Sequence, residues 1–309
     1  MENPLIALSI ELAATADRAG RSVVAVNARW RNSSSGVIWR KDVIVTADHT
    51  IRREEEIRVT LPDGRAAAAE LAGRDPGTDL AVLKVETTAA PIARPTAPDS
   101  VKTGNLALAI GRAEQIGVNA AMGVVSNASG PWHTWRGGKL DRFLRLDIGL
   151  YPGVSGAAVV DVEGKLIGIA TAGLSRTSLL AIPAATIDRV TDELLRQGHV
   201  AHGYLGIGLQ PIALPEHLMR TKLELPPGSA PGAGLIVLSV EPEGPAGQAG
   251  VVIGDVLVAL EGTPVTGTDD VQEFLSGDHV GKPLKASLLR GGELMEKTIT
   301  VGERPRRRS

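Results

Sequence analysis

Cysteine is absent from the 309 residues of this chain. Disulfide bonds, thiolate nucleophiles and cysteine-based metal sites are therefore excluded, and the redox compartment stays open. Aromatic residues make up only 3% of the chain, whereas hydrophobic residues make up 43%. The cores must consequently be built from valine, leucine, isoleucine and alanine, and a chain of this length favours about two domains.

An excess of charge of one sign is also missing. The 33 basic and 35 acidic side chains leave a net charge of −2. Because no overall basic field would attract nucleic acid, a nucleic-acid partner is not expected. The one basic run is the tail 304–309, which is most simply a solvated chain end.

The N-terminus lacks the basic start and the cleavage site of a secretory signal, and charged residues interrupt its apolar stretch. The chain alone thus predicts a cytoplasmic protein, with a periplasmic or other extracytoplasmic location as the alternative if a preceding segment was removed. Apolar residues and a run of alanines predict an N-terminal helical segment over 1–21 that ends near Gly20.

Two sets of short β patterns follow, over 22–85 and 106–183, with the proline-rich segment 89–100 between them. Turn residues separate most of the strands, which predicts two β-barrels or sandwiches joined by a linker. Helical spacing then appears over 182–198 and stops at Gly198. The remaining residues, about 100 in number, predict a second, mixed α/β domain.

Three residues far apart in the sequence carry the candidate chemistry. His49 ends an apolar strand, Asp79 opens another, and Ser155 lies in "LYPGVSGAAVV". Each alone has an ordinary structural explanation, as a strand-end histidine, a turn carboxylate or a turn hydroxyl. Together they supply what a serine nucleophile needs, namely a neutral imidazole base and a carboxylate that orients it. Gly153 would let the chain bend so that backbone amides converge on an oxyanion.

No metal site or other cofactor is expected. His199 and His202 lie three residues apart but have no carboxylate at metal-ligand spacing.

The segments "TADHTI", "TDLAVLKV" and "PGVSGAAVVDVEGKLIGIAT" resemble the histidine, aspartate and serine motifs of chymotrypsin-fold serine proteases. Their likeness is strongest to the HtrA (Deg) family, in which such a protease precedes a PDZ domain. The resemblance runs from about residue 20 to residue 302. It implies an all-β, chymotrypsin-like protease domain of two six-stranded barrels over 22–199, followed by a small α/β PDZ domain over 203–303.

By this resemblance, His49 is the general base, Asp79 orients it, and Ser155 attacks the scissile carbonyl. The amides of Gly153 and Ser155 would form the oxyanion hole. The resemblance further implies a primary specificity pocket in the segment 168–174, with a preference for small or medium apolar side chains. The pocket residues expected there are Ile169, Ala170 and Thr171.

The segment "YLGI" over 204–207 resembles the carboxylate-binding loop of a PDZ domain, whose successive amides hold a peptide C-terminus. An edge strand and a short helix would complete the groove, although their apolar residues could instead pack the core. The candidate peptide-binding residues are Tyr204, Leu205, Gly206, Ile207, Gly208 and Leu209 on the loop and strand, and Val271, Phe274 and Leu275 on the helix.

The resemblance implies an ATP-independent serine endopeptidase that degrades unfolded or damaged proteins and binds peptide C-termini through its PDZ domain. The loop 127–142 takes the place of one that relays ligand signals to the active site. Family members commonly form trimers through an aromatic-rich N-terminal segment. The resemblance therefore allows a homotrimer, but residues 1–21 contain no aromatic residue that would support it.

The nucleophile motif departs from the family pattern G-N-S-G-G-P. Val154 places a β-branched side chain where a small polar residue is usual, and it restricts the local backbone. Ala157 and Ala158 replace the glycine and proline after the bend. These departures favour the alternative of a catalytically impaired, peptide-binding or chaperone-like scaffold. Asp48 beside His49 is also unusual, and its side chain is expected to face away with little effect.

Overall fold

The computed structural model describes residues 3–30, 32–86, 90–214, 233–275 and 277–305. The basic tail predicted over 304–309 thus lies mostly outside the described residues. The chain divides into two compact units, residues 1–200 and residues 201–309. Each unit is described by itself.

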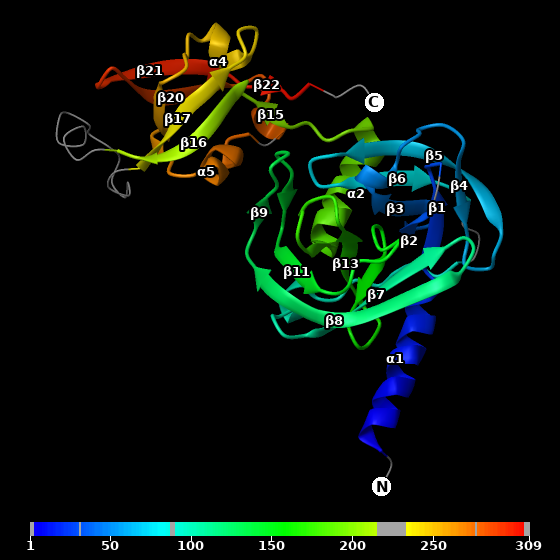
Figure 1. Cartoon of the computed structure of the whole chain (residues 1–309). Coiled ribbons are helices and arrows are strands. Elements are labelled where there is room, and N and C mark those ends of the chain that lie inside the picture. The colour runs from blue at the N-terminus through cyan, green and yellow to red at the C-terminus, as the bar shows by residue number, and fades with distance from the viewer. Residues whose placement is uncertain (1–2, 31, 87–89, 215–232, 276, 306–309) are drawn as a thin grey trace. The chain divides into compact units, whose positions relative to one another are not determined.

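The first unit contains two closed six-stranded barrels, as the resemblance implied (Figure 1). The first barrel has the strand order β1-β2-β3-β6-β5-β4. Its strands are β1 (Val23–Asn27), β2 (Ser34–Arg40), β3 (Val43–Ala47), β4 (Ile57–Thr60), β5 (Ala66–Asp75) and β6 (Leu80–Lys84). The second barrel has the order β11-β14-β13-β12-β7-β8, and its long strand β8 runs along the barrel in Figure 1. Its strands are β7 (Leu106–Ala113), β8 (Gly117–Ser129), β11 (Phe143–Asp147), β12 (Ala158–Val160), β13 (Leu166–Thr171) and β14 (Leu179–Pro183).

Three shorter elements connect these strands. The single 3-10 turn η1 (Asp48–Thr50) follows β3, and η2 (Pro98–Ser100) lies in the segment between the barrels. The small hairpin of β9 (Trp132–His133) and β10 (Lys139–Leu140) projects between β8 and β11.

Aliphatic side chains fill this unit, as the scarcity of aromatics predicted. Each barrel has its own interior cluster, and a third cluster joins strands of both barrels to the helix α2 (Ala184–Gln197). Trp39 is the one buried aromatic residue among the described part of the chain. Closely packed aliphatic cores of this kind make the barrels rigid supports for the loops between them.

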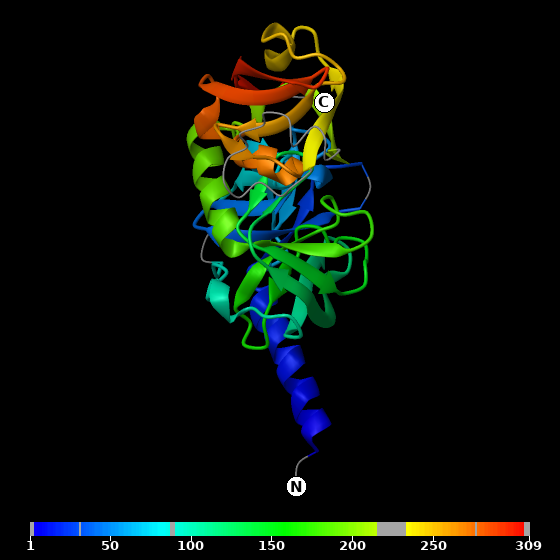
Figure 2. The ribbon, with the colours of Figure 1, turned by 90° about the vertical axis from the view of Figure 1, so that its left-hand side faces the viewer.

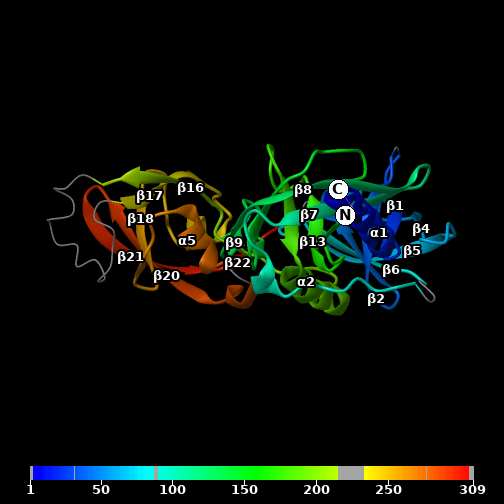
Figure 3. The ribbon, with the colours of Figure 1, turned by 90° about the horizontal axis from the view of Figure 1, so that it is seen from below.

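Helix α2 forms where sequence periodicity predicted it. Ile187, Val190 and Leu194 make one buried stripe that packs into the shared cluster. Gly198 ends the helix in the left-handed conformation at φ 76°, and its amide donates to the Leu194 carbonyl at 2.9 Å. Figure 3 shows α2 lying alongside the barrel strands.

Helix α1 (Pro4–Gly20) begins at the cap Asn3, whose side chain accepts a hydrogen bond from the Leu5 amide at 3.0 Å. Only its last turns are buried, and Figure 2 shows its first half extending away from the barrels. Four large apolar side chains are exposed there: Leu5, Ile6, Leu8 and Ile10. Within the described residues, no helix has both the length and the apolar character needed to cross a membrane.

In its described residues, the second unit is a sheet with two short helices and a 3-10 turn. Its strand order is β16-β17-β18-β20-β21, with β19 (Thr263–Pro264) paired to β18. The main strands are β16 (Ile207–Ala213), β17 (Ala233–Val240), β18 (Val256–Leu260), β20 (Pro283–Arg290) and β21 (Glu293–Thr300). A separate pair joins β15 (Gly203–Tyr204) to β22 (Gly302–Glu303), and the helical elements are α4 (Pro245–Gln248), α5 (Thr268–Glu273) and η3 (Gly277–His279). This β-rich unit confirms the expected second domain fold.

Candidate active site

His49 and Asp79, which lie 30 residues apart in the sequence, meet at one end of the first barrel. Strand β3 delivers His49 on the turn η1, and β6 begins directly after Asp79. The Asp48 amide donates to the Asp79 carbonyl at 3.0 Å, and the His49 amide donates to Asp79 Oδ1 at 2.8 Å. His49 Nδ1 lies 2.8 Å from Asp79 Oδ2. The carboxylate therefore holds both the backbone and the ring of the histidine.

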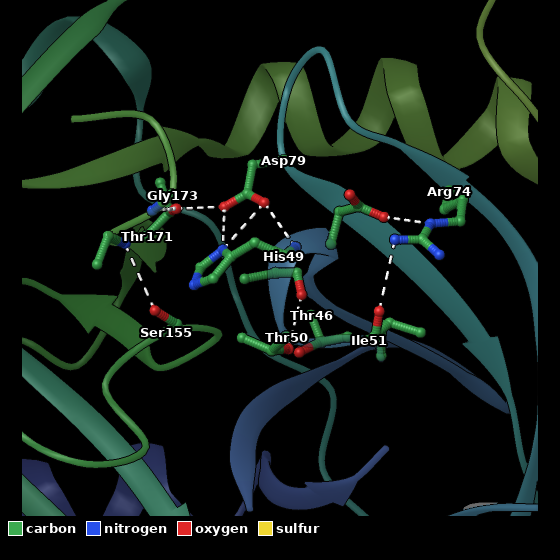
Figure 4. Close-up of polar contacts among 12 residues, drawn as sticks. Thr46, His49, Thr50, Ile51, Arg74, Asp79, Ser155, Thr171 and Gly173 are labelled. Atoms are coloured by element: carbon green, nitrogen blue, oxygen red, sulfur yellow. Dashed lines mark hydrogen bonds and ion pairs between the residues drawn. The ribbon is translucent and has the colours of Figure 1, made fainter. Parts of the chain in front are cut away.

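The Asp79 carboxylate is fully buried, so its charge needs several donors. Besides His49, the Thr171 hydroxyl donates to it. Gly173 passes so close that a Cβ atom there would lie 2.5 Å from His49 Nδ1 and 2.7 Å from Asp79 Oδ2. Because Nδ1 faces the carboxylate, it carries the proton, and Nε2 is left as the acceptor. Figure 4 shows the His49 ring between Asp79 and Ser155, with its second nitrogen on the side of Ser155.

Ser155 lies on a tight bend that glycines make accessible. Gly153 has φ 89° and Gly156 has φ 84°, both in the left-handed region that side chains disfavour. A Cβ atom at Gly156 would also lie 1.8 Å from the Ser35 carbonyl oxygen. The Ser155 hydroxyl accepts a long hydrogen bond from the Ala172 amide at 3.4 Å. Among the described residues it makes no hydrogen bond to His49.

Ser35 on β2 holds the nucleophile bend through hydrogen bonds to two of its carbonyls. Its amide donates to the Ser155 carbonyl at 3.1 Å, and its hydroxyl donates to the Gly153 carbonyl at 2.7 Å. The same hydroxyl accepts from the Arg112 amide at 2.9 Å, and the Thr46 hydroxyl donates to the Ser35 carbonyl at 2.6 Å. Ser35 is fully buried. These four bonds fix which way the peptide units of the bend point.

The amides of Gly153 and Ser155 have no hydrogen-bond acceptor within the described residues. Their carbonyls, by contrast, are both bound to Ser35. Two N–H groups beside a serine hydroxyl are the arrangement that stabilises a negative oxygen. The predicted oxyanion-hole residues are thus brought together with the predicted nucleophile.

Comparisons with known proteins agree with this geometry. Residues 34–169 match the family model of the trypsin-like peptidase domain, and residues 203–301 match that of the PDZ domain. The putative serine protease HhoB of Synechocystis is 32% identical over 284 residues, which cover 90% of this chain and 68% of that protein. The serine endoprotease DegS of Salmonella typhimurium is 32% identical over 288 residues, covering 89% of this chain and 78% of DegS.

The chain belongs to the HtrA family of serine proteases.

Solved structures of this family share the fold over nearly the whole chain. The HtrA-type protease AlgW with a decapeptide has 28% identity and a TM-score of 0.76, covering 95% of this chain and 99% of AlgW. The serine endoprotease from Yersinia pestis has 31% identity and a TM-score of 0.74, covering 94% and 98%. The predicted fold, two chymotrypsin-like barrels followed by a PDZ domain, is therefore confirmed.

Val154, where the HtrA motif departs from the family pattern, points into the second barrel. Its side chain is 4% exposed and packs in the apolar cluster that includes Ala157 and Ala170. Its amide donates to the Tyr151 carbonyl at 3.1 Å, so the bend closes as a hydrogen-bonded turn. The sequence raised the concern that a β-branched residue would disturb this bend. In the structure the valine and the following alanine match apolar surroundings instead.

Asp48 has a larger role than the sequence suggested. Its carboxylate is buried, and Arg74 Nε donates to it at 2.6 Å. Arg74 also pairs with Glu54 at 2.8 Å and donates to the Ile51 carbonyl at 3.5 Å. Burial raises the pKa of the Asp48 carboxyl, and the bond to Arg74 opposes that rise. This network anchors the turn that carries His49.

The residues expected to line the specificity pocket are placed differently from one another. Ile169 is fully buried in the cluster between the barrels, and Ala170 is fully buried in the second barrel. The Thr171 hydroxyl is occupied by Asp79. The hollow beside the bend is lined instead by the residues that follow β13, with Leu150 from the opposite loop. The continuous apolar run of β13 could have signalled this, because all of its residues are buried and only the loop that follows can open to solvent.

The predicted relay loop docks next to the triad. The Thr134 hydroxyl is buried and donates to the Gly77 carbonyl at 2.7 Å, two residues before Asp79. Trp132 packs edge-on against Phe143 with ring centroids 5.2 Å apart. These two contacts, together with hydrogen bonds such as the one from the Asp141 amide to the Thr186 hydroxyl at 2.9 Å, hold the loop 127–142.

In the PDZ unit, the predicted groove residues divide into core and surface. Strand β16 is an edge strand, and α5 packs near it. Val271 and Leu275 are 3% and 6% exposed and belong to the core of this unit. Phe274, Ile207 and Leu209 are half-buried and pack on the outside of that core. The half-buried set is therefore the part available to a ligand.

The predicted carboxylate loop has free donors. Leu205 is buried, Gly206 has φ 75°, and neither amide has an acceptor within the described residues. Burial, followed by the hydrogen bond to Glu241, raises the pKa of Tyr204 to about 12. A Cβ atom at Gly208 on β16 would lie 2.5 Å from the Ser239 hydroxyl on β17. The loop thus presents N–H groups that have no acceptor among the described residues.

Proposed function

We propose that this HtrA-family protease is an ATP-independent endopeptidase that degrades unfolded proteins with His49, Asp79 and Ser155 as its catalytic residues. One observation carries the proposal: the buried Asp79 carboxylate holds the His49 ring, and this ring lies beside Ser155. The amides of Gly153 and Ser155 have no acceptor among the described residues.

The chemistry begins when the Ser155 hydroxyl oxygen attacks the scissile carbonyl carbon. His49 Nε2 takes the hydroxyl proton as the new C–O bond forms. The carbonyl oxygen becomes negative and accepts hydrogen bonds from the amides of Gly153 and Ser155. The long Ser155–Ala172 bond is weak enough to be exchanged for the one to His49.

The tetrahedral intermediate then collapses. The protonated His49 gives its proton to the leaving amine, the C–N bond breaks, and an acyl ester remains on Ser155. Water attacks this ester with His49 again acting as base, which releases the acid and restores the hydroxyl. Water is the only co-reactant, so no step consumes a nucleotide.

An extended, unfolded segment fits this site best because the nucleophile lies at a loop-lined surface hollow rather than in a closed cavity. The PDZ unit would bind a peptide C-terminus, with its carboxylate on the Leu205 and Gly206 amides and its strand along β16. The loop 127–142 would connect ligand binding to catalysis through the Thr134–Gly77 bond. If substitution of Trp132 and Trp135 changes neither basal nor peptide-stimulated cleavage, this relay is wrong.

One experiment tests the catalytic proposal. The purified chain and Ser155→Ala are incubated with unfolded casein and with a fluorophosphonate probe, in the presence and absence of ATP. Labelling at Ser155 and cleavage without ATP are expected, and the variant should lose about 10⁴-fold or more in rate.

The rival function is a peptide-binding scaffold, which the missing Ser155–His49 bond favours. It would replace the endopeptidase if the unmutated chain neither reacts with the probe nor cleaves casein, yet still binds C-terminal peptides.

A further inference from the structure

Two hollows meet at the nucleophile bend. One, of about 640 Å³, is lined by Trp135, Leu150 and the loop residues 172–176 with Ser178. The other, of about 420 Å³, contains Ser155 and Gly153 and reaches Arg29 and Asn32. Leu150 and Ala172 line both, so the two hollows adjoin each other; together they are called the cleft, and Ser155 lines the second of them.

The charges along this cleft are all of one sign. No aspartate or glutamate is found among the described residues that line either hollow, whereas each hollow has one arginine, Arg176 or Arg29. This local excess contrasts with the net charge of −2 for the whole chain. A cleft lined by one sign of charge concentrates ligands of the opposite sign.

Among the residues that the structure describes, the half-buried cation Arg29 has no carboxylate partner. Its Nε donates to the Asn32 carbonyl at 2.8 Å and its Nη2 to the Ser33 carbonyl at 3.4 Å. Burial, and then the charge of Arg52, lower the pKa of the Arg29 guanidinium. A partly buried charge that lacks a counter-charge is unfavourable, so a carboxylate placed beside it would be stabilised.

Arg176 occupies the other hollow in a different way. It is exposed on the loop after β13 and makes no ion pair within the described residues. Leu174 and Leu150 give this hollow an apolar wall. Trp135, 69% exposed, adds an aromatic ring over which the Arg136 guanidinium lies at 4.5 Å. The hollow thus combines an apolar surface with a cationic rim.

We infer that the cleft selects polypeptide segments in which acidic residues flank the apolar residue at the scissile bond. The apolar side chain packs against Leu150 and Leu174, while carboxylates on the two sides of the bond pair with Arg176 and Arg29. Lysine or arginine at the same positions is repelled. This inference rests on the proposed endopeptidase function and names its substrate class.

The test uses the full chain and fluorogenic peptides of one parent sequence with an apolar residue at the cleaved bond. Each position from three before to three after that bond carries glutamate, glutamine or lysine in turn. At one position or more on each side, kcat/KM should fall from glutamate to glutamine to lysine, by about fivefold or more overall. Added salt should reduce this range, because screening weakens exposed charge pairs.

Substitutions of the two arginines show which of them is responsible for the preference on each side of the scissile bond. Arg176→Glu should invert the order on one side of the bond, so that lysine becomes the preferred residue there. Arg29→Gln should flatten the order on the other side, and Arg29→Lys should keep part of it, which separates charge from any change in the loop. The control Arg58→Glu alters an exposed arginine on β4 that lines neither hollow, and it should leave all preferences unchanged.

The outcomes separate this inference from the proposed function. If glutamate, glutamine and lysine peptides are cleaved equally while Ser155 reacts with the fluorophosphonate, the acidic preference is wrong and the endopeptidase stands. If no peptide is cleaved and Ser155 does not react, the endopeptidase itself is wrong. If Arg58→Glu shifts the preferences as much as Arg176→Glu does, net charge rather than the cleft is responsible.

Discussion

Two loops in this protein have backbone amides without an acceptor among the described residues, and they differ in what surrounds them. The nucleophile bend has Gly153 at φ 89°, and the PDZ loop has Gly206 at φ 75°. The nucleophile bend is clamped by the buried Ser35 and faces His49. The PDZ loop instead has the carboxylate of Glu241 hydrogen-bonded to Tyr204. The first arrangement suits a charge that appears only during a reaction, and the second suits a permanent carboxylate.

The largest effect is expected from Asp79→Asn, which removes the charge behind His49. An amide would present N–H groups to Nδ1 and favour the wrong tautomer, so kcat should fall by about 10⁴. Peptide binding by the PDZ unit should not change, as measured by fluorescence anisotropy. The exposed Asp63→Asn serves as the control. An equal loss in both variants would contradict the assignment.

The second largest effect is expected from Ser35→Ala, because it removes the hydrogen bond to the Gly153 carbonyl while leaving the backbone of β2 in place. We expect kcat for short peptides to fall by about 10²-fold with little change in KM, since the amides matter only when the oxyanion forms. A peptide boronate, which mimics that state, should lose affinity in parallel.

The matched control is Ser34→Ala, which alters the adjacent buried serine whose hydroxyl donates to Val26 instead. Equal losses in KM and kcat, or equal effects of both variants, would show that Ser35 serves stability alone.

Gly206→Ala tests the second loop. A Cβ atom there would lie 3.2 Å from Gly244 Cα, on a residue with positive φ. Binding of a peptide with a free C-terminus should weaken about tenfold, roughly the cost of one such strained residue. Cleavage of short peptides should be unaffected.

Gly262→Ala provides the control, because Gly262 has φ 73° but no atom within 4 Å of the added carbon. If both alanines weaken binding equally, general strain explains the loss. Amidation of the peptide C-terminus should abolish the difference between the unmutated chain and Gly206→Ala.

The smallest effect concerns acid stability of the PDZ unit. Arg290 donates to both oxygens of the buried Asp255, and these bonds, with one from the Val252 amide, hold the pKa of that carboxyl below its usual value. A lowered folded-state pKa stabilises the unit above the unfolded value near 4, and the stabilisation disappears as pH falls through the folded one.

Asp255→Asn should therefore lower the Tm at which the PDZ unit unfolds by about 5 °C at pH 7, and by less near pH 3. Differential scanning calorimetry measures both. The exposed Asp278→Asn should change neither value, and a loss for Asp255→Asn that does not depend on pH would contradict the ion-pair explanation.

Much of the fold could be predicted from local patterns. Helical spacing over 182–198 and the stop at Gly198 correspond closely to α2, because apolar periodicity and a glycine cap are local properties. Barrel closure required more than the β patterns, which allow a sandwich equally well. The family motifs supplied that choice.

The site divides in the same way. His49, Asp79 and Ser155 could be recognised from residue type and order. Ser35, Thr171 and Gly173 could not, because their importance lies in contacts across the fold rather than in any motif. The same reason explains why the direction of the Val154 side chain could not be judged from its β-branched shape.

By itself, the sequence determined the classes of chemistry. Without cysteine and with its histidine, aspartate and serine in this order, the chain was restricted to a serine-based site on aliphatic β-domains. Only the tertiary structure decided that the amides of Gly153 and Ser155 find no acceptor in the described part of the chain and that their carbonyls are held by Ser35. It also decided that each of the two hollows carries one arginine. Hydrogen-bond direction and local charge depend on which distant segments meet, and only the folding of the whole chain brings those segments together.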